Sequence, residues 1–99
     1  MSDEALAGFA ALRRAAIEAP GTLDRGTRQA ALAGQPVRPE LAAYVDKVRR
    51  HAYRVTDGDV DTLRRAGYSE DQVLELTIAT AVGAGLERLD AGLRALEER

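Results

Sequence analysis

The side chains with the clearest chemical potential lie close together in one segment of the chain. His51 is the only histidine among the 99 residues, and histidine is the side-chain type that exchanges protons most readily near neutral pH. Its neighbours carry positive charge on both sides: Lys47, Arg49, Arg50 and Arg54. Acid/base companions by residue type are Tyr44, Glu75 and Glu87. The segment is consistent with acid/base chemistry, although a charged run with a lone histidine is more often an ordinary solvated helix face.

The amino-acid composition excludes several classes of reaction and argues against some kinds of partner. The chain has no cysteine, which excludes disulfides, thiolate metal sites and thiol catalysis. The formal net charge of −2 argues against a dedicated nucleic-acid binder, despite the basic residues around His51. No nucleic-acid partner is therefore expected.

Two motifs that suggest a metal or a cofactor fail in detail. The run Asp57-Gly-Asp59-Val-Asp61 begins like a calcium loop, but Thr62 and Tyr68 stand where such a loop needs its glycine and its bidentate glutamate. Gly83-Ala-Gly85 begins like a dinucleotide fingerprint, but it follows no strand, and Arg88 occupies the third glycine position. We expect no metal and no cofactor.

Hydrophobic periodicity and helix boundary signals predict an all-α protein of about five helices, one of them long and C-terminal. The chain length fits a single domain over residues 1–99, with N-terminal helices and a loop over 1–38 and a helical core over 40–95. The predicted helices cover residues 4–17, 23–32, 39–53, 57–66 and 70–98.

Local signals set most of these boundaries. Thr22 is the predicted cap of the second helix, which ends at Gly34. Pro39 suits the first turn of the third helix. Capping boxes over residues 56–59 and 69–72 precede the last two helices.

The third predicted helix has a distinct apolar face. Its members are Leu41, Tyr44, Val45, Val48, Ala52 and Val55. At about 100° per residue, Lys47, Arg50 and Arg54 fall on the far side and flank. His51 lies between the two, close to the line of Tyr44.

The last predicted helix is too long for a compact monomer. Its length is about 43 Å, against about 33 Å for the width of a 99-residue globule. Either Gly83 and Gly85 break or bend the helix, or its end packs on another subunit, and we favour the second. Its small residues, which include Ala79, Ala81 and Ala84, permit close approach by a helix of the same chain or of another. Both readings stay open.

A cytoplasmic, soluble protein is expected. The N-terminal residues are acidic and lack the basic start and apolar run of a secretion signal. The weakly polar run over 73–86 is shorter than a membrane span and contains Glu75. We therefore expect no membrane partner.

One extended pattern resembles a known family. The run Asp59-Val-x-x-Leu-Arg-x-Ala-Gly67-Tyr-Ser-x-Asp-x-x-x-Glu75-Leu, followed by Arg88-Leu-x-x-Gly-Leu93, is similar to the carboxymuconolactone decarboxylase and alkylhydroperoxidase-D-like group. The resemblance covers residues 40–95. It implies a small all-helical protein assembled as a trimer or hexamer.

The resemblance also suggests positions for a site. In the peroxidase branch two cysteines and a histidine share a helix, and those positions fall here on Tyr44, Lys47 and His51. The spacing of that branch's proton-relay glutamate falls on Leu32. Thiol peroxidase and disulfide reductase activities are therefore not expected. Tyr44, Lys47 and His51 remain the candidate catalytic residues.

The leading functional hypothesis is a non-redox, homo-oligomeric protein of this kind, with a binding or accessory role toward an unidentified ligand. A small molecule is open as that ligand. One alternative is a small acid/base enzyme of the decarboxylase or isomerase type, using His51 with Tyr44 as partner. Another is a structural helical domain that docks on other proteins. Whether the chain is an enzyme stays open.

Overall fold

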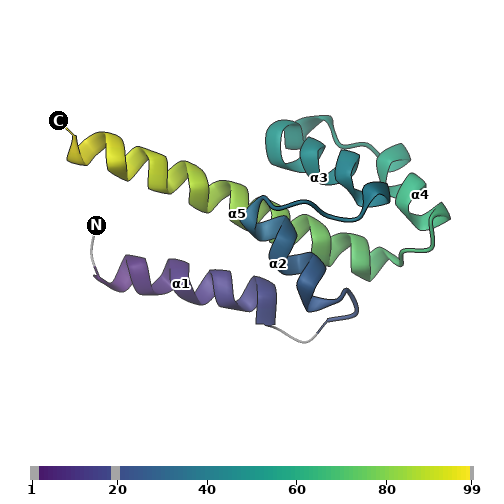
Figure 1. The fold of residues 1–99 in the computed structure, drawn as a ribbon, viewed down its shortest axis with the longest axis horizontal. Coiled ribbons are helices and arrows are strands. Elements are labelled where there is room, and N and C mark those ends of the chain that lie inside the picture. Colours follow the sequence, from purple (N-terminus) through teal and green to yellow (C-terminus); the bar gives the residue numbers. More distant parts are fainter. Residues whose placement is uncertain (1–2, 19–20, 99) are drawn as a thin grey trace.

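The computed structural model describes residues 3–18 and 21–98, which form helices joined by short connections (Figure 1). Five α-helices and a short 3₁₀-helix, η1, follow one another, and the described residues contain no strand. Their bounds are α1 Asp3–Glu18, α2 Arg25–Ala33, α3 Pro39–His51, η1 Ala52–Arg54, α4 Asp57–Arg65 and α5 Glu70–Glu97. The predicted all-α class is confirmed, with every helix end within two residues of its expected position.

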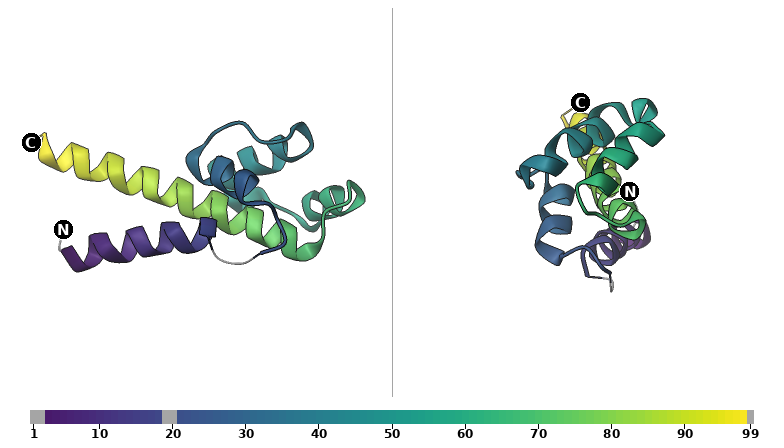
Figure 2. Two further views of the ribbon diagram at one scale, coloured as in Figure 1. Left: turned by 60° about the horizontal axis from the view of Figure 1, so that its bottom comes forward. Right: turned by 90° about the vertical axis from the view of Figure 1, so that its right-hand side faces the viewer.

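The long helix α5 is the element on which the others pack. Helices α1, α2, α3 and α4 all contact it, and α1 runs beside it in the opposite direction (Figure 1). Figure 2 shows α1 and the C-terminal part of α5 extending together away from the other helices. This two-helix arm gives the molecule extents of 48 × 27 × 21 Å.

Helix α5 runs without interruption through both of its central glycines, Gly83 and Gly85. Its 28 residues make it about 42 Å long. The alternative of a break at these glycines is therefore wrong. Although α5 is long, neither it nor any other helix in the described residues is apolar enough to cross a membrane.

The small residues of α5 divide between two sides of the helix. Ala79 and Ala84 are buried, and a Cβ added at Gly83 would lie 1.9 Å from the backbone oxygen of Leu32. The backbone of α2 therefore rests directly on α5. Gly85 faces open space, with no atom within 4 Å of an added Cβ. The intrachain use of small residues is confirmed for the inward side only.

Side-chain and glycine caps explain the ends of α2. Asp24 caps its start by accepting a hydrogen bond from the Thr27 backbone N–H at 2.9 Å. The prediction of Thr22 as this cap is wrong, because Thr22 contacts Glu75 of α5 instead. Gly34 ends the helix in the left-handed conformation, with φ 71°, as expected for glycine at that position.

Both predicted capping boxes are confirmed. Thr56 accepts from the Asp59 backbone N–H while Asp59 accepts from that of Thr56. Ser69 and Gln72 form the same reciprocal pair at the start of α5. Each box satisfies N–H groups that have no partner within the helix.

The third helix is shorter than predicted. It starts with Pro39 in its first turn, as expected, but ends at His51 and continues as the 3₁₀-turn η1. Its predicted apolar face is buried at four positions: Leu41, Tyr44, Val45 and Val48. Ala52 is exposed, because it lies beyond the last α-helical turn. Val55 is half-buried against the core.

One hydrophobic core joins α2, α3, α4 and α5. Its buried members are Leu23, Ala31, Leu32, Leu41, Tyr44, Val45, Val48, Leu63, Val73, Leu76 and Ala79. Aliphatic side chains of moderate size dominate this core. Each such side chain contributes about 1.5–3 kcal/mol when fully buried.

Gly83→Ala should destabilise the fold, because the new methyl group would meet the Leu32 backbone rather than a movable side chain. We expect a loss of about 1–3 kcal/mol in the free energy of unfolding, measured by urea denaturation. The matched control is Gly8→Ala in α1, where an added Cβ meets nothing within 4 Å. Equal stabilities of the two variants would contradict the close α2–α5 contact.

Candidate functional site

Tyr44 is buried beneath α5, at 7% exposure, and its hydroxyl lies 2.6 Å from the Thr77 hydroxyl. Thr77 donates its own proton to the Val73 carbonyl oxygen at 2.6 Å. A hydroxyl has one proton to donate, so Tyr44 must be the donor to Thr77. The phenol proton of Tyr44 is thus engaged in holding α3 to α5.

Lys47 is half-buried and engaged with the start of α4. Its Nζ lies 2.9 Å and 3.0 Å from the two carboxylate oxygens of Asp59. The backbone N–H of Thr56 and the Lys47 ammonium group together hold the pKa of Asp59 below its ordinary value. Lys47 therefore supports the capping box of α4.

Tyr44 and Lys47 share one small pocket between α3 and α4. Its volume is about 130 Å³, and its lining residues are Glu40, Ala43, Tyr44, Lys47, Asp59, Thr62 and Leu63. This is smaller than the range of about 300–1,000 Å³ typical of small-molecule sites. The structure thus brings two of the three predicted site residues together.

His51 is not part of that pocket. It is the last residue of α3 and has φ −144° and ψ 54°, outside the helical region. Its ring is exposed and meets Tyr53 edge-on at a centroid distance of 6.0 Å. The guanidinium group of Arg54 lies 5.7 Å from the same tyrosine ring. The catalytic role of His51 stays a prediction.

Much of the basic segment is used in packing. Arg49 forms an ion pair with Glu87 of α5 and donates hydrogen bonds to the backbone oxygens of Ala31 and Leu32, at 3.0 Å and 3.2 Å. Arg49 therefore caps the C-terminus of α2. Arg50 pairs with Asp46 one turn earlier, at 2.8 Å.

Glu75, another predicted companion of His51, holds the segment before α2. Its carboxylate accepts hydrogen bonds from the backbone N–H groups of Thr22 and Leu23 at 2.8 Å and 2.7 Å. Burial raises the pKa of Glu75, but these backbone hydrogen bonds outweigh burial, so the pKa lies below its ordinary value. Glu75 is a structural anchor in this chain.

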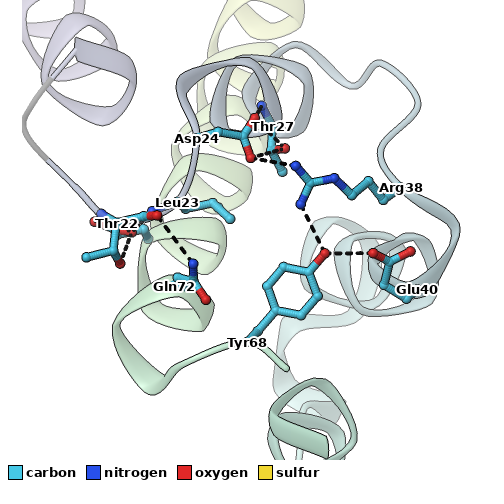
Figure 3. Close-up of polar contacts among 9 residues, drawn as sticks. Thr22, Leu23, Asp24, Thr27, Arg38, Glu40, Tyr68 and Gln72 are labelled. Atoms are coloured by element: carbon cyan, nitrogen blue, oxygen red, sulfur yellow. Dashed lines mark hydrogen bonds and ion pairs between the residues drawn. The ribbon is translucent and has the colours of Figure 1, made fainter. Parts of the chain in front are cut away.

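A second polar cluster joins three connections of the fold (Figure 3). Arg38 pairs with Asp24 at 2.8 Å and donates to the Tyr68 hydroxyl at 3.1 Å. Tyr68 in turn donates to Glu40 at 2.7 Å, which lowers the pKa of that carboxyl group. The pKa of Asp24 is lowered mainly by hydrogen bonds from Thr27 and, to a smaller extent, by the positive charge of Arg38. All of these acceptors are engaged within the fold.

Two larger hollows lie on the surface. A wide depression of about 950 Å³ over the α4–α5 turn is lined largely by groups already used in capping and ion pairing, such as Ser69, Gln72 and Arg64. A groove of about 530 Å³ lies between α1, the end of α2 and α5. No group of three metal-binding side chains occurs among the residues that the structure describes.

An uncovered side of α5, which we call the open face, was predicted only in part, through small residues such as Ala81 that permit close approach by another helix. Its members are Leu74, Ile78, Ala81, Gly85, Arg88, Gly92 and Leu96, all exposed. At about 100° per residue they fall within about 40° of one line along the helix. The opposite side of the helix is buried against α2, so the sequence pattern of α5 alone does not reveal which side lacks a partner.

Comparison of the chain with known protein families, curated proteins and solved structures finds no match. The resemblance to carboxymuconolactone decarboxylase-like proteins therefore stays a prediction.

Tyr44→Phe should leave the fold intact and remove one hydrogen bond. Because the Thr77 hydroxyl can still donate to Val73, the expected loss is about 1 kcal/mol in the free energy of unfolding. Tyr53→Phe, at a side chain with 80% exposure, should change little. A larger loss in the Tyr53 variant would contradict these assignments.

Glu75→Gln should lower the stability at neutral pH by about 1 kcal/mol, since a partly exposed, charge-assisted hydrogen-bond network is weakened. The pKa of Glu75 is lower in the folded protein than in the unfolded chain. The ionised carboxylate therefore stabilises the fold at pH values above the ordinary carboxyl pKa, and this stabilisation is lost as the pH falls through the pKa of the folded protein. The stability gap between the wild type and Glu75→Gln should therefore narrow on acidification, as measured by urea denaturation at pH values from neutral downward. Glu98→Gln, at an exposed end of α5, is the matched control and should show no such gap.

Proposed function

We propose that this chain is a non-redox, homo-oligomeric helical protein with a binding or accessory role, of the kind found in the carboxymuconolactone decarboxylase-like group. Three features of the sequence and fold agree with the proposal, in addition to the exposed surface area of the chain. The chain lacks cysteine, its described part is wholly built from helices and their connections, and its longest helix leaves one side uncovered. The assembly expected from the resemblance is a trimer or hexamer.

The observation that carries the proposal is the amount of surface left exposed. The single chain exposes 6592 Å², about 1,100 Å² more than the roughly 5,500 Å² expected for a compact monomer of 10.6 kDa. Its radius of gyration, 14.6 Å, likewise exceeds the value of about 12.6 Å for 99 compact residues. A standard interface covers about 800 Å² on each partner. Self-association would therefore bury on each chain an area comparable with this excess.

The contacts of the candidate site speak against catalysis by Tyr44 and Lys47. The Tyr44 hydroxyl is bonded to Thr77, and Lys47 is paired with Asp59. The pocket that they share is small, and His51 is not among its lining residues. A general acid or base needs a proton that it can transfer to substrate, whereas these groups are engaged with the fold.

Static light scattering coupled to size-exclusion chromatography tests the proposal. At micromolar concentration we expect a stable species larger than one chain. A monomer under these conditions would contradict self-assembly.

A further inference from the structure

The open face of α5 has the composition of a buried surface. Three of the five large apolar side chains left exposed in the described residues belong to it: Leu74 at 57%, Ile78 at 47% and Leu96 at 60% exposure. Gly85 and Gly92 lie between them, and an added Cβ at either glycine would meet no atom within 4 Å. The open face thus carries large apolar side chains toward both ends and, at the two glycines between them, no side chain that projects from the helix.

The spacing along this face keeps its members on one side of α5. From Leu74 to Gly92 they follow one another at alternating intervals of four and three residues, an average of about 3.6, which is the period of a straight stripe along an α-helix. Arg88 is the one charged member, and its guanidinium group donates to the Arg49 backbone oxygen of α3 at 2.8 Å. The positive charge of Arg88 is therefore held toward α3.

We infer that a second copy of this chain covers the open face, with the two α5 helices antiparallel and a two-fold axis passing beside Gly85. This inference rests on the self-association proposed above and specifies its geometry. The axis places Leu74 of one chain opposite Leu96 of the other. It also places Ile78 opposite Gly92, and Ala81 opposite the half-buried Leu89.

Large side chains meet small ones in this arrangement. Ile78 fills the space left by Gly92, and Leu89 fills the space beside Ala81. At the axis, Gly85 faces its own copy, so the backbones can approach closely there. A parallel arrangement would instead place Gly92 against an identical glycine and Ile78 against an identical isoleucine, so that no large side chain would fill the space beside Gly92.

A two-fold contact restricts the assembled state. It is isologous, since both chains use the same surface. On its own it gives a dimer, and combined with a three-fold axis it gives a hexamer. It excludes a simple trimer. The surface excess of about 1,100 Å² per chain is large enough to include a standard contact of about 800 Å² per partner.

Single cysteines can test the pairing without ambiguity, because the chain has none of its own. The probe is disulfide formation under mild oxidation, followed by non-reducing electrophoresis. A mixture of the Ile78→Cys and Gly92→Cys proteins should give a cross-linked dimer, whereas each variant alone should cross-link far less. Ala66→Cys, at an exposed position after α4, is the control and should remain monomeric on the gel. Efficient cross-linking of Ile78→Cys alone, with no additional cross-linked dimer when Gly92→Cys is added, would overturn the antiparallel geometry.

Glycine substitutions provide an independent test. Gly85→Gln adds a side chain in open space of the single chain, so helix content by circular dichroism should be retained while the two-fold contact is blocked. The mass from light scattering should fall by half, from dimer to monomer or from hexamer to trimer. Gly8→Gln in α1 also adds a side chain in open space and should leave the mass unchanged.

The outcomes separate the two proposals. An even-numbered wild-type assembly that Gly85→Gln halves supports the two-fold pairing. A wild-type trimer, or an assembly that Gly85→Gln leaves intact, overturns the pairing but keeps the proposed self-association. A wild-type monomer overturns both.

Discussion

The direct contact between the backbones of α2 and α5 is the constraint on which the other packing depends. The Leu32 carbonyl group occupies the space that any side chain at position 83 would fill, so glycine there sets the distance between the two helices. That approach leaves the last carbonyl groups of α2 within reach of Arg49, whose guanidinium group also pairs with Glu87. Helix α3 is thereby attached to both helices at once, and the core lies between the three.

Local physics made most helix boundaries predictable from the sequence. The boxes that begin at Thr56 and Ser69 complete themselves within four residues, and Gly34 supplies a conformation that other residues rarely adopt. The cap of α2 was mispredicted because Thr22 and Asp24 are both suitable residue types. Glu75, more than fifty residues away, engages Thr22, and no local pattern reveals a contact of that range.

The relative positions of the candidate site residues could be predicted only for those that lie within a regular helix. Tyr44 and Lys47, three residues apart, lie about 60° from each other around α3, so that Lys47, which was assigned to the flank and far side, still reaches the pocket that Tyr44 lines. Four residues further, His51 would share that side in a continuous helix, but α3 ends there with non-helical dihedral angles. The open face of α5 was predicted only in part, for a different reason. Periodicity identifies which residues share a side, whereas the position of α2 decides which side is covered.

The anchoring of the N-terminal segment by Glu75 has a consequence for the order of folding. The two capping boxes and the turns of α4 and α5 involve neighbours in sequence, and such contacts form quickly. The contacts of Glu75 with Thr22 and Leu23 span 53 and 52 residues, so the chain must lose the entropy of a long loop before they contribute any stability. We therefore expect the contacts between the segment before α2 and α5 to form later than the capping boxes and helical turns.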